Sequence, residues 1–166
     1  MSGWNAEYLQ IVKEFSYDKK LDLDSAIILD SILKESNSFQ NIQKRIQKQP
    51  VFVIGAGPSL SSAIPFLKKF KKITKIAADS TLKPLIKHEI KPDLVVTDLD
   101  GDERTLRKIG KTDTIFVVHA HGDNIDRIKT AHNFKNCIGT TQSKTFDQIQ
   151  NFGGFTDGDR AVFLAS

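Results

Sequence analysis

Aspartates recur in the polar loops that separate the short apolar runs of this chain. Five are in such loops: Asp79 in AADST, Asp98 and Asp100 in TDLDGD, Asp123 in HAHGDN and Asp157 in FGGFTDGDR. In an open α/β sheet, the loops at the carboxyl ends of neighbouring strands meet in one crevice. Carboxylates gathered there repel one another unless a cation lies among them. Because hard oxygen ligands suit Mg²⁺, which often binds together with a phosphate, the pattern predicts a metal-dependent nucleotide enzyme.

The two aspartates of TDLDG are the first candidates for metal ligands. Side chains two residues apart in extended backbone point the same way, so Asp98 and Asp100 could share one Mg²⁺. Gly101 would let the chain turn sharply after them, and Asp102 is expected to cap the helix that follows. Asp79 is a further candidate ligand, from the loop after the preceding strand.

A glycine-rich turn, GAGPS, lies between an expected strand and an expected helix. Such a turn presents backbone N–H groups and a helix N-terminus to phosphate. The candidate nucleotide contacts are Gly55, Gly57, Pro58, Ser59 and, in the next strand-end loop, Ser80. Ser59 could also cap the helix. The turn lacks the lysine of a Walker A loop, and Leu60 takes the third small position of a dinucleotide fingerprint. A tight turn without a ligand is the competing interpretation.

Two histidines and an acid follow the strand expected at 114–119. His119, His121 and Asp123 could bind zinc, or they could form a substrate loop in which a histidine acts as a base. A strand-end histidine bonded to the backbone is the third interpretation. The substrate loop is favoured, and the other two stay open.

The last motif, FGGFTDGDR, leads into a short helix from Asp157. Thr156 and the acids suit a helix N-terminus, which is one interpretation. The glycines before them suggest instead a loop that fits closely over a flat ligand. Thr156 and Asp157 are then candidate ligand contacts, and Arg160 could pair with a phosphate.

Between these motifs the apolar pattern alternates between strand and helix. Strands are predicted at 51–54, 73–78, 93–97, 114–119 and 136–140, and helices at 59–70, 82–88, 103–109 and 124–131. This alternation predicts an α/β fold, a Rossmann-like three-layer sandwich with a mainly parallel sheet. Residues 1–48 form an N-terminal helical segment of two or three amphipathic helices, with Asp22 or Asp24 as candidate caps and no chemistry of their own.

Length and composition narrow the class of protein. The 166 residues carry a net charge of +4 and 39% hydrophobic residues, as expected for one globular α/β core. There is no apolar run long enough for a membrane span and no signal-peptide pattern. The single cysteine, Cys137, is expected to be buried on a strand, and its isolation fits the cytoplasm. The lysine clusters lack the interleaved aromatics of a nucleic-acid surface. We therefore expect small-molecule partners, and the sequence leaves a homo-oligomer open.

Taken in order, GAGPSL, AADST, PDLVVTDLDG, HAHGDN and FGGFTDGDRA resemble the archaeal-type 6-hydroxymethyl-7,8-dihydropterin pyrophosphokinase family. That family is similar in fold to the catalytic domain of thiamine pyrophosphokinase. The resemblance covers Val51 to Ala165, which implies a catalytic domain at 49–166 after the helical segment at 1–48. Because the family continues beyond the point where this chain stops, and the last helix has no cap, we expect an abbreviated form.

The resemblance implies a reaction. ATP would donate its β,γ-diphosphate to the hydroxymethyl oxygen of the dihydropterin and release AMP, as a step in tetrahydromethanopterin or folate-type pterin biosynthesis. Mg²⁺ would lie at Asp98 and Asp100, with Asp79 as a further ligand. The other implied roles are phosphate or ribose binding by 55–59, proton acceptance by His121 or Asp123, and contact with the pterin or nucleotide by Thr156 and Asp157.

Three other functions stay open. A metal-dependent nucleotide-sugar glycosyltransferase of the motility-accessory type has a related glycine-loop domain, although such proteins are typically much longer. An NAD-dependent enzyme with Asp79 on the ribose would leave the other acidic loops without a role. A non-catalytic nucleotide-binding module would bind ATP tightly without turnover.

Overall fold

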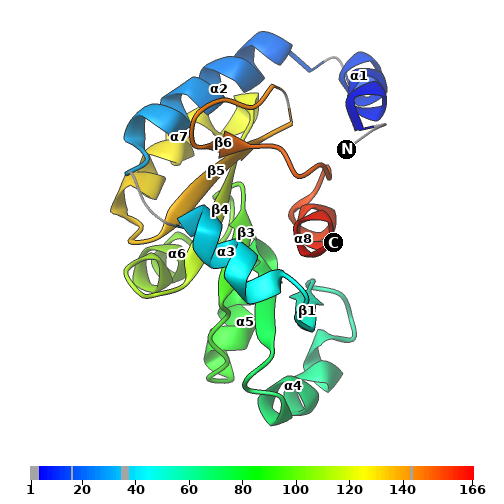
Figure 1. The fold of residues 1–166 in the computed structure, drawn as a ribbon, viewed down its shortest axis with the longest axis vertical. Coiled ribbons are helices and arrows are strands. Elements are labelled where there is room, and N and C mark those ends of the chain that lie inside the picture. Colours follow the sequence, from blue (N-terminus) through cyan, green and yellow to red (C-terminus); the bar gives the residue numbers. More distant parts are fainter. Residues whose placement is uncertain (1–3, 16, 35–37, 143) are drawn as a thin grey trace.

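A computed structural model of the chain describes residues 4–15, 17–34, 38–142 and 144–166. Its centre is a six-stranded parallel sheet whose strands lie side by side in chain order (Figure 1). The strands are β1 Val51–Ile54, β2 Thr74–Ala78, β3 Leu94–Thr97, β4 Ile115–Ala120, β5 Cys137–Thr141 and β6 Ile149–Gln150. The predicted α/β class with a parallel sheet is confirmed, and all five predicted strands are present. The pattern does not predict β6, because two residues are too few to show a period.

Helices cover both faces of this sheet. They are α1 Trp4–Phe15, α2 Lys19–Ile32, α3 Ser38–Ile46, α4 Leu60–Lys69, α5 Leu82–Lys87, α6 Glu103–Gly110, α7 Ile125–Ile128 and α8 Asp157–Ala165. Val95 and Phe116 belong to the core layer shared with α2 and α4 to α7. Val96 and Val117 belong to the layer shared with α3 and α8. Alternate strand residues thus bury both faces, and the predicted three-layer sandwich is confirmed.

The sequential strand order determines where the loops lie. Because α4 to α7 each return the chain to the next parallel strand, the loops after β2, β3 and β4 lie next to one another at the carboxyl edge of the sheet. The 3₁₀ turns Asp79–Thr81 and Gly122–Asn124 follow β2 and β4 directly. The predicted motifs that contain Asp79 and Asp123 therefore lie on either side of the loop that contains Asp98.

The residues that cap the helix N-termini agree only in part with the predicted caps. Asp102 caps α6 as predicted, since its carboxylate accepts from Thr105 N at 3.0 Å. Ser59 precedes α4 without a side-chain cap hydrogen bond, because its backbone is already helical. Asp18 rather than Asp22 or Asp24 caps α2, with its carboxylate accepting from Lys20 N at 2.8 Å.

Two of the N-terminal helices pack on the sheet. Ala26 and Leu29 of α2 are fully buried in the first core layer, and Ile42 of α3 is buried in the second. Residues 1–3, 16 and 35–37 of the predicted helical segment lie outside the described residues.

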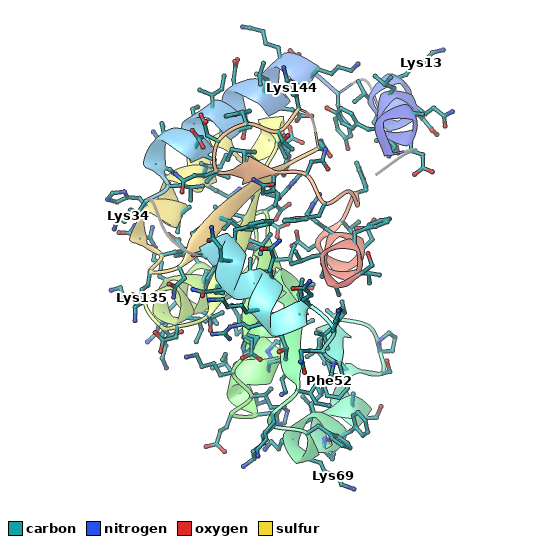
Figure 2. All side chains as sticks on the ribbon, viewed as in Figure 1. Lys13, Lys34, Phe52, Lys69, Lys135 and Lys144 are labelled. Atoms are coloured by element: carbon teal, nitrogen blue, oxygen red, sulfur yellow. The ribbon has the colours of Figure 1, made fainter. Side chains whose placement is uncertain are left out.

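Lysine side chains lie on several parts of the surface (Figure 2). Lys13 and Lys69 lie at opposite ends of the molecule in Figure 2, and Lys34 and Lys135 lie on one side between them. Cys137 is free and buried on β5, as predicted. Across the described part of the chain, no helix combines the length and the apolar character that crossing a bilayer requires.

Candidate active site

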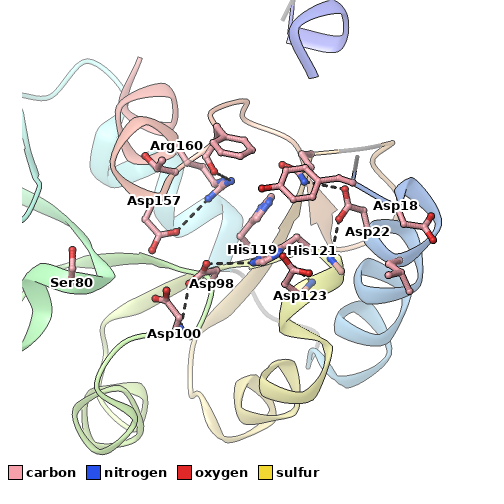
Figure 3. Close-up of a pocket in the computed structure, with 16 residues that line it drawn as sticks. Asp18, Asp22, Ser80, Asp98, Asp100, His119, His121, Asp123, Asp157 and Arg160 are labelled. Atoms are coloured by element: carbon pink, nitrogen blue, oxygen red, sulfur yellow. Dashed lines mark hydrogen bonds and ion pairs between the residues drawn. The ribbon is translucent and has the colours of Figure 1, made fainter. Parts of the chain in front are cut away.

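A cavity of about 420 Å³ opens at the carboxyl ends of β3 and β4 (Figure 3). The start of α8 and the junction between α1 and α2 form its other walls. The predicted site residues that line it are Ser80, Asp98, Asp100, His121, Asp123, Thr156 and Asp157. The glycine turn at 55–59 does not line this cavity.

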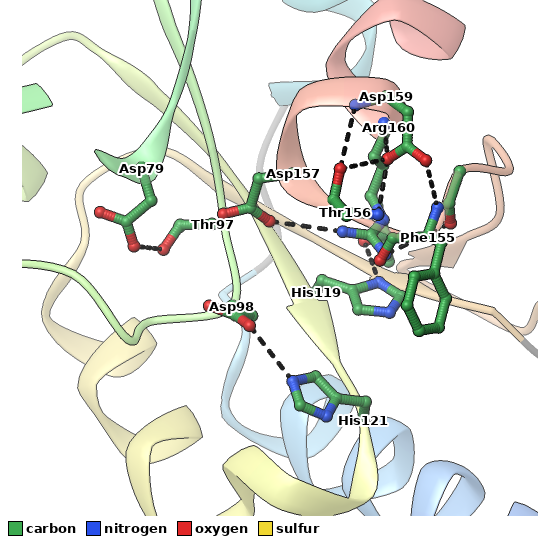
Figure 4. A network of polar contacts seen from close by, with 12 residues as sticks. Asp79, Thr97, Asp98, His119, His121, Phe155, Thr156, Asp157, Asp159 and Arg160 are labelled. Carbon is green, nitrogen blue, oxygen red and sulfur yellow. Dashed lines mark hydrogen bonds and ion pairs between the residues drawn. The ribbon is translucent and has the colours of Figure 1, made fainter. Parts of the chain in front are cut away.

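Three carboxylates from three elements converge beside the cavity, which Asp98 and Asp157 line and Asp79 does not. Asp79, Asp98 and Asp157 each offer an oxygen atom, and these atoms lie within 4.8 Å of one another. Oδ2 of Asp79 accepts a hydrogen bond from the Thr97 hydroxyl (Figure 4) and another from Gly101 N at 3.2 Å. Oδ1 of Asp79 is buried and has no hydrogen-bond partner among the described residues. A buried, unpaired carboxylate oxygen beside two more carboxylates fits a hard cation such as Mg²⁺, which would satisfy all three.

The pKa values of these acids reflect their crowding. Burial and then the charge of Asp98 raise the pKa of Asp157 to about 8, against the opposing effect of Arg160. Burial is also the largest cause of the raised pKa of Asp79. Burial acts to raise the pKa of Asp98 as well, but hydrogen bonds and the charge of His121 outweigh it and lower the pKa to about 2. At neutral pH, Asp98 is therefore ionised, whereas Asp157 retains a proton that a bound cation would displace.

Asp100 lies beside Asp98 but outside the group of three. The extended backbone assumed between the two aspartates is not present, because Leu99 has φ +69° and turns the chain. Such a conformation is uncommon for leucine, and the buried side chain of Leu99 holds it in place. Asp100 is exposed, and its N–H donates to Asp98 Oδ1 at 3.3 Å.

His121 serves to position Asp98. Its Nε2 lies 3.4 Å from Asp98 Oδ2, and its Nδ1 accepts from Asp123 N at 3.3 Å. Asn124 Nδ2 donates to Asp98 O at 2.8 Å and to His119 O at 2.7 Å, which ties this loop to the end of β3. Both imidazole nitrogens of His121 are thus engaged. The exposed Asp123 carboxylate makes no hydrogen bond or ion pair with the described residues, so it is the freer proton acceptor.

The histidines of this loop do not form a metal site together. His119 is 3% exposed, and its Nδ1 lies 3.0 Å from Thr140 Oγ1. Its ring centroid lies 5.9 Å from that of His121. Within the described ranges, the group of acids, histidines or cysteines close enough to hold a metal is the carboxylate group, which contains no histidine. The geometry therefore gives no support to the zinc interpretation.

The start of α8 is a capped helix whose residues also face the cavity. Thr156 and Asp159 form a reciprocal capping box, as the helix interpretation predicts. Arg160 is 3% exposed, and its guanidinium donates to Asp157 Oδ1 at 3.3 Å and to Phe155 O at 3.1 Å. Arg160 thus holds Asp157 and the loop before it, rather than standing free for a phosphate.

The glycine turn follows the edge strand β1, which pairs with β2, and it lies outside the cavity lining. Gly55, Gly57, Pro58 and Ser59 are exposed, and neither glycine has a positive φ. A Cβ at Gly55 or Gly57 would meet nothing within 4 Å. Packing does not require glycine here, and the open backbone is accessible to a ligand.

Sequence reasoning missed the contribution of the N-terminal helices to the cavity. Tyr17, Leu21 and Asp22 line it, together with Gln142 from the end of β5. Asp22 is buried and accepts hydrogen bonds from Tyr8 Oη at 2.6 Å and Gly122 N at 2.9 Å. One signal was available, since Asp22 shares a helix face with Ala26 and Leu29, and an acid on an apolar face needs a partner.

By fold and site, this chain is one of the α/β proteins that gather ligands at the carboxyl ends of parallel strands. The sequence model of a family described as 6-hydroxymethylpterin diphosphokinase MptE-like matches residues 27–166. The chain belongs to this family.

Three curated relatives are named 6-hydroxymethyl-7,8-dihydropterin pyrophosphokinase. The protein from Methanocaldococcus jannaschii is 40% identical, over 99% of this chain and 73% of its own length. The protein from Pyrococcus furiosus is 45% identical, over 98% of this chain and 70% of its own length. The protein from Methanothermobacter thermautotrophicus is 39% identical, over 98% of this chain and 71% of its own length.

Proposed function

We propose that this chain catalyses the Mg²⁺-dependent transfer of diphosphate from ATP to 6-hydroxymethyl-7,8-dihydropterin, with AMP and the pterin diphosphate as products. Membership of the family and the names of the three relatives support the reaction. The observation that carries the metal site is the buried Oδ1 of Asp79, which has no hydrogen-bond partner in the described part of the chain and lies beside Asp98 and Asp157. The product would enter pterin biosynthesis of the tetrahydromethanopterin or folate type.

At the β-phosphorus the transfer forms one bond and breaks one bond, and the hydroxyl proton passes to a base. The hydroxymethyl oxygen bonds to the β-phosphorus of ATP, the bond from that phosphorus to the α,β-bridging oxygen breaks, and AMP leaves with that oxygen. Mg²⁺ held by Asp79, Asp98 and Asp157 would neutralise charge on the phosphate oxygens during the attack. Most of the remaining catalysis is positioning and preorganised electrostatics, which rigid side chains supply best.

The side chains around the carboxylates are suited to that positioning. His121 orients Asp98, and the buried guanidinium of Arg160 orients Asp157. Asp123 is our candidate for the group that takes the hydroxyl proton, since it lines the cavity and its carboxylate has no hydrogen-bond or ion-pair partner among the described residues. Asp100 lies close enough to Asp98 to contact the same phosphates through water.

We assign the nucleotide to the side of the cavity that leads toward β1. Ser80 lines that side, and the open backbone of the glycine turn at 55–59 follows β1. Thr156 and Asp157 at the start of α8 face the same space. On this assignment, residues 49–166 form the catalytic domain, and the helical segment at 1–48 supplies one wall of its cavity.

A product assay tests the proposal. Purified protein is incubated with ATP, Mg²⁺ and 6-hydroxymethyl-7,8-dihydropterin, and AMP is separated from ADP. We expect AMP to form in the same amount as pterin diphosphate and only when the pterin is present. Formation of ADP would indicate a simple kinase, and nucleotide turnover that ignores the pterin would contradict the assignment of the acceptor.

A further inference from the structure

The wall of the cavity formed by the α1–α2 junction and the loop before α8 is aromatic. Tyr17 and Phe155 both line the cavity, their ring centroids are 6.3 Å apart, and each is 37% exposed. Phe15 stacks on Tyr17 at 5.7 Å and on Phe155 at 6.3 Å. Aromatic faces left open to solvent at the side of a polar cavity are suited to a flat ring.

The backbone holds Phe155 firmly in this place. Its N–H donates to Asp159 Oδ2 at 3.0 Å, and its carbonyl accepts from Arg160. Gly154 before it has φ +85°, and a Cβ there would lie 2.6 Å from the Arg160 backbone. Phe155, His119 and Asp157, all labelled in Figure 4, line the same cavity. These contacts fix the backbone that carries the Phe155 ring, two residues before Asp157.

The His119 imidazole lines the same cavity as this aromatic wall, and its Nε2 is a hydrogen-bond acceptor without a donor among the described residues. Thr140 Oγ1 donates to Val118 O at 3.3 Å and lies 3.0 Å from His119 Nδ1, so we assign the proton of the His119 ring to Nδ1. Burial, and then the charges of Arg160 and His121, lower the pKa of His119 well below its usual value, although Gln142 acts in the opposite direction. The neutral imidazole thus has its lone pair at Nε2. That atom is buried and has no partner among the described residues.

Two neighbouring side chains add further acceptors. Gln142 Nε2 donates to Asp22 Oδ2 at 3.0 Å, so the other atom of that amide is an acceptor oxygen. Asp22 is a buried carboxylate that also lines the cavity. This part of the cavity therefore presents hydrogen-bond acceptors from His119, Gln142 and Asp22, and a ligand with several N–H donors on one edge would complement them.

We propose that the ring of the pterin, rather than the adenine of ATP, lies against Tyr17 and Phe155, with His119 Nε2 accepting a hydrogen bond from its N–H edge. This inference rests on the proposed function. A 2-amino-4-oxopyrimidine ring carries an amino group next to a ring N–H, so it offers adjacent donors. Adenine offers one amino group between ring acceptors, which would leave His119 and Asp22 facing lone pairs.

Leucine substitutions test the aromatic wall, because leucine keeps apolar bulk but cannot stack. The dissociation constant of 6-hydroxymethylpterin is measured by fluorescence titration, and that of Mg²⁺ with a non-hydrolysable ATP analogue by calorimetry. We expect Tyr17→Leu and Phe155→Leu each to weaken pterin binding by about tenfold and to leave nucleotide binding unchanged. Phe163→Leu is the matched control, since Phe163 is 41% exposed on α8 and does not line the cavity.

A pair of ligands tests the acceptor edge without altering the protein. In 6-hydroxymethyllumazine, a carbonyl oxygen replaces the 2-amino group of the pterin. We expect the wild-type chain to bind the pterin at least about tenfold more tightly. Equal affinity for the two ligands would overturn the inference, and so would leucine variants that weaken the nucleotide instead of the pterin. Wild-type protein that binds no pterin and forms no AMP would overturn the proposed function itself.

Discussion

A single methyl group added at Gly101 is expected to disturb the carboxylate group. A Cβ at this position would lie 1.9 Å from Asp79 Oδ1 and 2.5 Å from its Cγ. Real Cβ atoms essentially never approach within 3.0 Å, so the carboxylate must withdraw by the difference, about 1.1 Å. Asp79 is 4% exposed and bonded to Thr97, so it cannot swing into solvent without breaking buried hydrogen bonds.

The size of the effect follows from that displacement. A misplacement of about 1 Å in a positioned group typically lowers turnover about 10²-fold, so we expect kcat/KM of Gly101→Ala to fall by that order. Overpacking of this kind lowers the free energy of unfolding by about 1–3 kcal/mol. At this chain length, each kcal/mol corresponds to about 2–4 °C in Tm. Steady-state AMP formation and thermal unfolding by circular dichroism measure the two effects.

Gly158→Ala makes the same chemical change where there is room. A Cβ at Gly158 would meet only Thr156 Oγ1, at 3.9 Å, and the residue is inside α8. Alanine is favoured over glycine in a helix by about 0.5–1 kcal/mol, so this variant should unfold at a slightly higher temperature. Gly101→Ala with the kcat/KM and Mg²⁺ affinity of the wild type would refute the reasoning, because Asp79 would then move without consequence.

Two further predictions concern protons and packing. Because the pKa of Asp157 is about 8 in the metal-free protein, Mg²⁺ binding at pH 7 should release about one proton, and Mg²⁺ affinity should rise with pH up to that value. Calorimetry in two buffers of different ionisation enthalpy measures the proton, and a count of zero would contradict the Asp157 assignment. Leu29→Ala should lower the free energy of unfolding by about 2–5 kcal/mol, since Leu29 is fully buried. Leu23→Ala on the same helix is the control, because Leu23 is 41% exposed, and urea unfolding that gave equal losses would contradict the packing of α2.

The strands and the proximity of the three carboxylates were accessible to sequence reasoning, but Asp157 was predicted to contact the pterin or the nucleotide rather than the metal. Short apolar runs mark buried parallel strands, and the residue after each run then lies at the carboxyl edge. This logic brings Asp79 and Asp98 together, and the structure places them so. The position of Asp157 cannot be derived in this way, because Asp157 does not directly follow a strand. It reaches the site at the start of α8, which packs on the face of the sheet opposite to α4–α7.

The features that sequence reasoning missed depend on long-range contacts or on local backbone. No local pattern indicates that Leu99 turns the chain between Asp98 and Asp100. Tyr17 and Phe155 are far apart in sequence, and only the folded chain shows that they form one wall. Such contacts carry no periodicity, so they become visible only when the elements are in place.

The most direct test of the central claim compares Mn²⁺ binding and AMP formation in the wild type and in Asp98→Asn. Asparagine keeps the shape of the side chain and removes one charge from a crowd of acids, so the fold should be retained. The claim that Asp79, Asp98 and Asp157 form the metal centre predicts loss of Mn²⁺ binding and a fall in turnover of about 10²–10³-fold or more. Asp100→Asn should lose less, because Asp100 is exposed and outside that group. Turnover and Mn²⁺ affinity close to wild type in Asp98→Asn would contradict the account.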